Sequence, residues 1–313
     1  MLANLNSFFI FVAPKILKNT FEKMTFNIIV LAKQVPDTRN VGKDAMKADG
    51  TVNRAALPAI FNPEDLNALE QALGIKDQFP GSKITVLTMG PVRAAEILRE
   101  GLFRGSDDGV LLTDRAFAGS DTLATSYALS MAIRKIGNFD LILAGRQAID
   151  GDTAQVGPQV AEKMGISQVT YVEEIQKIDS KKIRVKRRLD NGVEIVESPL
   201  PVLITVNNSA RPCRPRNAKL LQKYKHAKTV TERQAENIDY IGLYSSRPYL
   251  NLTEWSATDV NADPKLCGLA GSPTKVKKIE NVVFQAKESK RLTDSDEEID
   301  ELMKELIRNH TIG

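Results

Sequence analysis

Cysteine and histidine are scarce in this chain of 313 residues. It has two cysteines, Cys213 and Cys267, and two histidines, His226 and His310, and each pair is far apart in the sequence. A Cys/His zinc site needs four such ligands at close spacing, and small secreted scaffolds are dense in cysteine. The sequence therefore argues against a bound metal and against a disulfide scaffold. Both histidines lie in highly charged stretches, which also disfavours histidine-dependent hydrolysis.

A large excess of charge is lacking as well. The chain has 43 Lys and Arg against 39 Asp and Glu, a net charge of +4, which is too small for binding nucleic acid through bulk charge. An apolar run near the amino terminus, residues 8–13, is far shorter than the roughly 20 residues that cross a bilayer. Positive charges follow this run, whereas a secretory signal places them before it. We expect no membrane segment and a cytoplasmic location, with residues 1–23 as an extension ahead of the true start at Met24.

Short apolar runs alternate with amphipathic segments from Phe26 onward. Buried strands are predicted at 26–32, 83–88, 109–113 and 140–144, and helices at 62–76, 91–103, 121–136 and 153–164. In the first helix, Asn62 is the predicted N-cap and Pro63 stands in the first turn. This alternation predicts an α/β fold with a doubly wound, mostly parallel sheet.

The pattern changes near Ser167. Three antiparallel strands are predicted at 169–178, 182–188 and 193–197, the last two joined by a turn at 190–192, and a buried strand returns at 201–206. From about Tyr240 the chain has too few apolar residues for a core of its own, and it ends in an amphipathic helix after Thr293. We therefore predict three parts: an extension (1–23), an α/β nucleotide-binding domain (24–239) and a C-terminal helical arm (240–313).

The loop at residues 145–158 follows a predicted strand directly and leads into a helix, which puts it at the carboxyl edge of the sheet, where open α/β sheets bind ligands. Gly151 and the helix amino terminus would offer N–H groups to phosphate oxygens, and Thr153 and Gln155 would add side-chain donors. A plain connecting loop explains the pattern about as well, because neither GxGxxG nor GxxxxGK[ST] is present. Loops at 33–38, 59–65 and 89–91 converge on the same edge and favour an adenine-nucleotide pocket.

Residues 181–228 form a basic segment with 13 Lys and Arg and 3 Asp and Glu. Such a segment is usually a solvated surface, but it can also steer an acidic protein partner. Tyr224 is the one aromatic residue of this segment, so a platform for single-stranded nucleic acid is not supported. Leu220 and Leu221 are candidates for a protein-docking anchor. A local packing contact explains these two leucines equally well.

Taken together, these motifs resemble the β subunit of electron-transfer flavoproteins, over about residues 25–228. The pattern VxRxxDxGxExV at 185–196, followed by PxLIT at 201–205, is similar to the family signature, with Asn191 where Gly or Asp is expected. The segments KQVPD at 33–37, NP at 62–63 and QAID at 147–150 also look like the family. So many matches in the correct order are specific.

The resemblance implies a heterodimer with an α subunit, in which a Rossmann-like domain of the β subunit holds an adenine nucleotide. Ordinary members hold AMP there, whereas electron-bifurcating members hold a second FAD that exchanges a hydride with NADH. The positions carried over as cofactor-binding are Ala32, Asn62, Met89, Gln147, Asp150, Gly151, Asp152, Thr153, Ala154, Gln155, Val156 and Gly157. The resemblance also makes Leu220 the anchor for an acyl-CoA dehydrogenase-like partner, although Leu221 stands where a proline is often found.

Within the family, the chain is more similar to the bifurcating branch. The segment DGDTAQVGP at 150–158 and the segment ESKRL at 288–292 resemble that branch, and small residues at Gly151 and Ala154 would leave room for a flavin. A second hypothesis is a conventional carrier that holds a structural AMP. A third is a non-redox nucleotide-binding stress or signalling domain, which leaves the signature at 185–205 unexplained. We expect an electron carrier without catalytic side chains, because a flavin carries the chemistry, and an arm at 240–313 that wraps the α subunit.

Overall fold

The computed structural model describes residues 24–37, 58–236, 241–274, 289, 291–309 and 311–312. The extension at 1–23 lies outside the described residues, as do Glu288 and Lys290 of the ESKRL segment.

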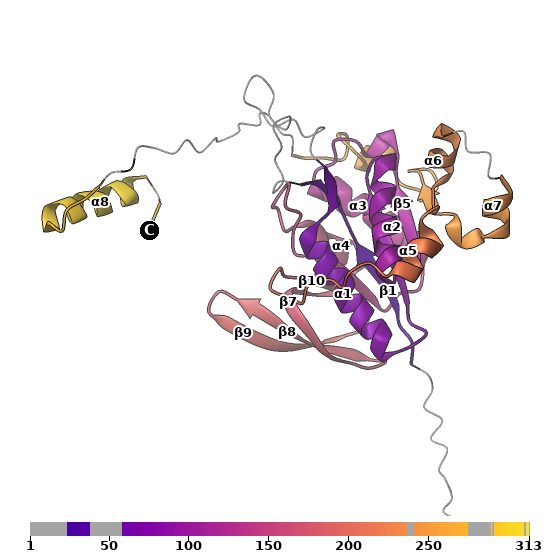
Figure 1. Cartoon of the computed structure of the whole chain (residues 1–313), viewed down its shortest axis with the longest axis horizontal. Coiled ribbons are helices and arrows are strands. Elements are labelled where there is room, and N and C mark those ends of the chain that lie inside the picture. The colour runs from indigo at the N-terminus through magenta and orange to yellow at the C-terminus, as the bar shows by residue number, and fades with distance from the viewer. Residues whose placement is uncertain are drawn as a thin grey trace, which may run out of the picture.

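A nine-stranded sheet forms the centre of the described chain (Figure 1). Its order is β11-β5-β4-β1-β6-β10-β7-β8-β9. The strands are β1 (Asn27–Leu31), β4 (Lys83–Met89), β5 (Asp108–Leu112), β6 (Leu141–Gly145), β7 (Ser167–Ile178), β8 (Lys182–Leu189), β9 (Gly192–Pro199), β10 (Val202–Val206) and β11 (Thr253–Trp255). Every pair from β11 to β7 is parallel, and β7, β8 and β9 pair antiparallel. The predicted doubly wound α/β sheet with an antiparallel extension is confirmed. A separate pair, β2 (Gln34–Pro36) and β3 (Ala59–Phe61), is antiparallel.

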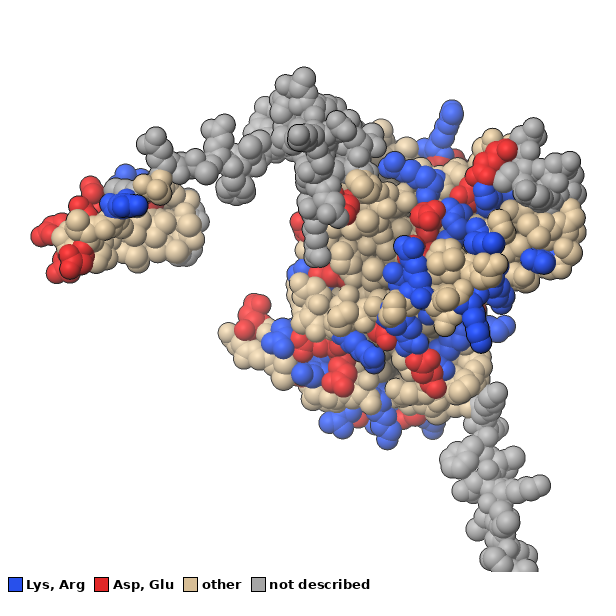
Figure 2. Space-filling model, in the orientation of Figure 1, with Lys and Arg blue, Asp and Glu red and all other residues tan. Residues whose placement is uncertain are grey.

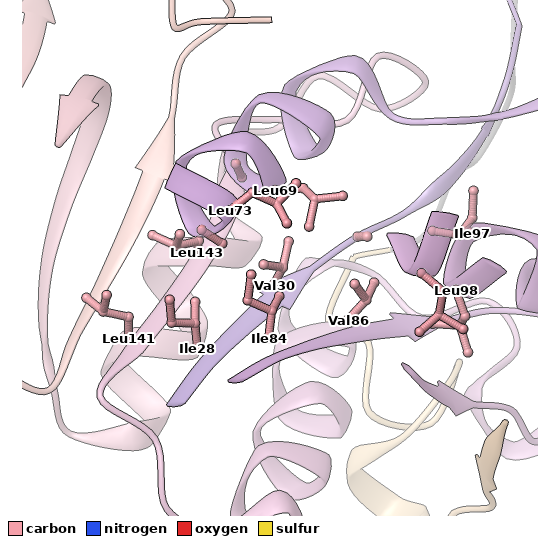
Figure 3. Close-up of a cluster of buried hydrophobic side chains, with 14 of the residues drawn as sticks. Ile28, Val30, Leu69, Leu73, Ile84, Val86, Ile97, Leu98, Leu141 and Leu143 are labelled. Carbon is pink, nitrogen blue, oxygen red and sulfur yellow. The ribbon is translucent and has the colours of Figure 1, made fainter. Parts of the chain in front are cut away.

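Helices cover both faces of the parallel part. α1 (Pro63–Gln78) and α2 (Ala95–Arg104) pack on one face, and α3 (Thr122–Ile136) and α4 (Val156–Met164) on the other. Along β1, Ile28 and Val30 belong to the first core and Ile29 and Leu31 to the second. Because both faces are buried, the strand reads as a continuous apolar run. Figure 3 shows the first core, where strand residues such as Val30 meet leucines of α1 and α2.

The chain changes direction across the sheet at β1. From β1 it proceeds through α1 to β4 and through α2 to β5, all on one side, and then crosses through α3 to β6 on the other side of β1. The boundary between β1 and β6 is therefore the topological switch point, and its carboxyl end is the expected ligand crevice of an open α/β sheet.

The chain after β10 returns to the edge of the same sheet. α5 (Ala218–Tyr224) packs on α2, followed by α6 (Val230–Ala235) and α7 (Ile241–Ser246). β11 then pairs with β5, and residues beside it, including Leu252, Val260 and Cys267, are buried. Residues 250–267 thus share the core of the main domain. The last described helix, α8 (Asp296–Arg308), is capped by Ser295, whose side chain accepts from the Glu298 N–H, and it buries none of its residues.

Two helices begin later than predicted. The helix expected from residue 91 begins at Ala95, after a 3₁₀ turn at Val92–Ala94. The helix expected from residue 153 begins at Val156, with Gln159 N donating to Gln155 O as its first hydrogen bond (3.0 Å). Asp152 and Ala154 have φ angles of 48° and 52°, left-handed values that cannot continue into an α-helix. Residues 151–154 therefore form a loop ahead of the helix instead of its first turn.

Candidate functional site

The carboxyl ends of β1, β4 and β6 lie side by side at the switch point. Leu31 at the end of β1 is paired with Leu87 of β4 and with Ala144 of β6. The residues that follow these positions include Ala32, Met89 and Gly145. The structure thus brings the sequence-predicted loops after β1, β4 and β6 to one edge.

Asn62 anchors the loop after β6 through both polar groups of its side-chain amide. It occupies the N-cap position of α1, as predicted, but its side chain makes no capping hydrogen bond. Instead, its Nδ2 donates to Gln147 O (2.9 Å) and its Oδ1 accepts from Ile149 N (3.2 Å). Asn62 has no exposed surface. Because both ends of the amide are bonded to the loop, the side chain fixes residues 147–149 against the start of α1.

Two carboxylates in the first turn of α1 add to this support, and the sequence prediction missed both. Glu64 accepts from Gln147 N (2.9 Å) and pairs with Arg146 (3.0 Å). Asp65 accepts from Lys33 N and from Gly145 N, both at 2.8 Å. Burial raises the pKa of Asp65 to about 7, against the opposing effect of these backbone donors. Acidic residues at a helix start are ordinary partners of the helix dipole, so nothing in the sequence marks them as buried loop supports.

Exposed side chains make polar contacts on the solvent-facing side of the same loop. Lys33 Nζ pairs with Asp150 at 2.7 Å, and Gln147 Nε2 donates to Asp152 Oδ1 at 2.8 Å. The N–H groups of Gly151 and Asp152 both donate to Ala148 O, at 3.2 and 2.9 Å. The loop is therefore a tight turn held from both sides.

The backbone of this loop is strained where the resemblance places the nucleotide. Asp152 and Ala154, with their positive φ angles, each carry roughly 1–2 kcal/mol of conformational cost. Gly151 is exposed, and a Cβ built on it would meet no atom within 4 Å. The protein itself does not require glycine at this position, so the open space beside Gly151 is available to a ligand.

The start of α4 presents backbone donors with no side-chain cap. Its N-cap, Gln155, makes no capping hydrogen bond, and the first N–H groups of any helix lack partners within the helix. The Gln155 Oε1 accepts from Thr122 Oγ1 of α3 (2.9 Å), which leaves its amide nitrogen to donate. Gly157 lets the helix approach β10, since a Cβ there would come within 2.7 Å of Thr205 Cγ2. The N–H groups of Val156 and Gly157 at the start of α4 thus lack partners within the helix, and helix-start donors of this kind can bind anions.

Leu220 lies apart from this edge, on α5. Asn217 caps α5 by accepting from Lys219 N (2.9 Å) and Leu220 N (3.2 Å). The Leu220 side chain is half-buried against the first core, whereas Leu221 is 37% exposed. Of the two leucines predicted as a docking anchor, Leu221 therefore offers more surface.

Basic side chains surround α5, and Figure 2 shows Lys and Arg gathered on the face that carries it. Arg214 pairs with Glu70, Arg216 with Glu100 and Lys228 with Glu236. Lys219, Lys223 and Lys225 are exposed and have no acidic partner among the described residues. Among the described residues, these three lysines are therefore unpaired positive charges beside α5.

Among the described residues, no group of three or more His, Cys, Asp or Glu side chains lies close enough to hold a metal ion. In the same part of the chain, every helix is too short or too polar to span a bilayer.

Comparison with known proteins identifies the family. The profile of the electron transfer flavoprotein domain matches residues 49–236, more than half of the chain. The chain is 43% identical over 252 residues to the electron transfer flavoprotein subunit beta of Clostridium acetobutylicum, covering 80% of this chain and 86% of that protein.

Two further relatives are named as parts of reductase systems. The chain is 44% identical over 249 residues to the caffeyl-CoA reductase-Etf complex subunit CarD of Acetobacterium woodii, covering 80% of this chain and 85% of the relative. It is 54% identical over 180 residues to the acryloyl-CoA reductase electron transfer subunit gamma of Anaerotignum propionicum, covering 57% and 66%. The chain therefore belongs to the electron transfer flavoprotein family, as a β subunit.

Proposed function

We propose that this β subunit binds FAD at the carboxyl edge of its sheet and, paired with its α subunit, passes electrons from NADH by electron bifurcation. The observation that carries the proposal is the loop at 146–155. Its residues 147 and 149 are hydrogen-bonded to Asn62 and Glu64, and it leads into the start of α4, which has no side-chain cap. A flavin, when bound, supplies the electron and hydride chemistry, and the protein positions it. The alternative is a conventional carrier with AMP in the same pocket.

The residues present fit a dinucleotide or a mononucleotide. The N–H groups at the start of α4, the free amide nitrogen of Gln155 and the exposed Thr153 are donors for phosphate oxygens. Gly151 borders open space, and Ala154 is small. These features favour a ligand that extends past the phosphates. For this reason we propose FAD as the ligand and keep AMP as the alternative.

The proposed electron acceptor is an acyl-CoA dehydrogenase-like protein that docks at α5. Two relatives carry names that join them to CoA-ester reductases. Leu220 and Leu221 lie among lysines that have no acidic partner in the described part of the chain, which suits an apolar anchor with electrostatic steering around it. We infer that an acidic surface on the acceptor faces this helix.

Of the predicted arm at 240–313, residues 250–267 pack on the main domain, and α8 is proposed to reach the α subunit. Ile299, Met303 and Ile307 are 47%, 44% and 55% exposed, and the helix buries no residue among those described. Apolar residues at this spacing form one face of the helix. A face of this kind is stabilised when a partner covers it.

Counting flavins separates the hypotheses. The α/β complex is co-purified, its visible absorption is recorded, and released flavin is measured per heterodimer. Two flavins support bifurcation, one supports the AMP-holding carrier, and none supports a non-redox nucleotide-binding domain. An anaerobic NADH titration without any dehydrogenase should bleach the flavin of the wild-type complex. A complex with one flavin that does not respond to NADH would end the bifurcation hypothesis.

Substitutions at Ala154 test whether the space beside the loop holds the flavin. Ala154→Leu keeps the strained φ of a non-glycine residue and adds bulk, whereas Ala154→Gly relieves the strain and adds none. We expect the leucine variant to lose flavin while still binding AMP, and the glycine variant to keep both. Gly151→Val is a companion probe, because its side chain would enter space that no protein atom occupies. Full flavin occupancy in both bulky variants would place the flavin elsewhere.

A further inference from the structure

The carboxylate of Asp65 ties together the two strands that border the switch point. Its two oxygens accept from different segments: one from Lys33 N just after β1, the other from Gly145 N at the end of β6, each at 2.8 Å. Asp65 is 7% exposed, and it reaches both segments from the first turn of α1. One side chain thus joins the two chain segments just beyond the last paired residues of β1 and β6, Leu31 and Ala144.

This contact leaves little room for adjustment. A Cβ built on Gly145 would lie 2.5 Å from Asp65 Oδ1 and 2.8 Å from Asp65 N, closer than non-bonded atoms approach. Glycine at 145 therefore allows the backbone of β6 to come directly against the carboxylate. From Gly145 the chain passes within a few residues to Asp150 and the strained turn, so the position of that turn depends on this junction.

A similar contact at the amino ends of β1 and β6 provides a comparison. Asp140, just before β6, accepts from Asn27 N at the start of β1 (2.7 Å). That bond is exposed and involves one acceptor oxygen of the carboxylate. Both aspartates tie β1 to the neighbourhood of β6, but only Asp65 does so beside the proposed nucleotide.

We propose that Asp65 is a positioning residue for the nucleotide pocket, whose ionised carboxylate holds the ends of β1 and β6 in the arrangement that binds the ligand. The inference rests on the proposed function, because it assumes that a nucleotide occupies this edge. An ionised carboxylate has two acceptor oxygens, whereas a protonated one must use one oxygen as a donor. Protonation of Asp65 therefore weakens its hold on either Lys33 or Gly145.

The charged groups around Asp65 determine how this contact responds to pH. Glu64 is its neighbour on α1 and pairs with Arg146 beyond β6, and Lys33 beyond β1 pairs with Asp150. The Lys33 and Arg146 charges are thus matched by other carboxylates, and Glu64 adds a negative charge beside Asp65. Burial raises the pKa of Asp65 to about 7, so its charge changes within the range where binding is readily measured. Nucleotide affinity should accordingly rise as pH increases from 6 to 8.

The test compares Asp65→Asn with Asp140→Asn in the full chain co-purified with its α subunit. Each replaces a carboxylate by an amide of the same shape, at opposite ends of the same strands. After bound nucleotide is removed, the affinities for AMP and for FAD are measured by calorimetry at pH 6, 7 and 8. We expect Asp65→Asn to bind at least tenfold more weakly than wild type at pH 8 and to lose most of the pH dependence. Asp140→Asn should match wild type throughout.

The phosphate of AMP itself titrates near pH 6, but it does so equally in both variants, and the pyrophosphate of FAD stays ionised across this range. Hydrogen exchange of the Lys33 and Gly145 amides gives a readout without ligand. Both amides, or one of them, should exchange at least tenfold faster in Asp65→Asn and at the wild-type rate in Asp140→Asn. Gly145→Ala is a second variant that displaces the contact while retaining the carboxylate, and it should also weaken binding.

The outcomes separate this inference from the proposed function. If wild type binds AMP or FAD and Asp65→Asn binds with the same affinity and pH dependence, the role of Asp65 is overturned and the pocket stands. Equal losses in Asp65→Asn and Asp140→Asn would also overturn it, because the effect would then be general destabilisation. If wild type binds neither probe, the proposed function fails and the inference fails with it.

Discussion

Asn62 and Asn217 both occupy the N-cap position of a helix, but their side chains make different hydrogen bonds. Asn217 caps α5 in the ordinary way, accepting from the N–H groups two and three residues ahead. Asn62 stands at the same position before α1, where Pro63 removes one backbone donor, and its amide bonds a loop 85 and 87 residues away. The proposed docking helix is thus organised locally, whereas the candidate nucleotide loop is organised by tertiary contacts. Substitutions in the docking helix should therefore have local effects. Substitutions around the nucleotide loop should lower both the stability of the fold and the affinity for the nucleotide.

The largest expected difference between these regions comes from removing the two asparagine side chains. Asn62→Ala removes a fully buried amide and leaves the part-buried Gln147 O and Ile149 N without these partners, so it should lower the free energy of unfolding by roughly 2–4 kcal/mol. Asn217→Ala removes an exposed cap, which costs about 1 kcal/mol. Denaturant unfolding of both variants, with nucleotide occupancy of the α/β complex, measures this. Equal losses of stability would show that the two asparagines contribute alike to the fold.

The pH dependence of stability sharpens the same comparison, because the loop region contains a buried acid. The folded-state pKa of Asp65 is raised to about 7 from 3.8, so between these values the folded protein keeps a proton that the unfolded chain has released. Its contribution to stability is complete below pH 3.8 and is lost as pH rises through about 7. Between pH 6 and 7 this lowers the free energy of unfolding by about 1 kcal/mol. Asp65→Asn should flatten that part of the stability profile, and an unchanged slope would show that Asp65 ionises normally.

At the docking helix, the two leucines should separate a packing effect from a partner effect. Leu221→Ala removes an exposed side chain and should slow electron transfer to the acceptor about tenfold with little change in stability. Leu220→Ala should slow it too, but with a loss of roughly 1 kcal/mol because Leu220 is half-buried against the core. Stopped-flow rates with the acceptor, and the visible flavin spectrum as the control, measure both. Unchanged rates in both variants would move the acceptor interface away from α5.

The sequence predicted the architecture well, because the strands of a doubly wound sheet are buried on both faces. Continuous apolar runs located β1, β4, β5, β6 and β10 within one or two residues of their bounds. The antiparallel strands β7, β8 and β9 were also predicted, and the turn at 190–192 joined the last two as expected. Local patterns sufficed for these elements.

The parts that were missed depend on contacts between distant residues. Asn62 was predicted to cap its helix, and the acids beside it had no assigned role, because a sequence motif does not show which loop packs above a helix start. The start of α4 was placed too early because Asp152 and Ala154 are not glycine, the usual marker of a positive φ. The return of β11 to the sheet was also missed, since three residues, Thr253–Trp255, are too short for a clear strand pattern.

The smallest expected effect concerns the lysines around α5, and it depends on salt. Lys219 and Lys225 are exposed and lack an acidic partner among the described residues, whereas Lys228 pairs with Glu236. Unpaired charges steer an acidic partner over a distance of about 10 Å at 0.1 M salt, and this attraction raises the association rate more than it strengthens the complex.

We therefore expect Lys219→Met or Lys225→Met to slow association with the acceptor a fewfold at low salt and to have no effect at 1 M salt. Lys228→Met is the matched control. It removes a charge already neutralised by Glu236, so it should change the association rate less at every salt concentration. Stopped-flow association rates measured across a salt series give the comparison. If all three variants share the wild-type salt dependence, the charge around α5 is a solvated surface with no steering role, and the docking hypothesis would then depend on the leucines alone.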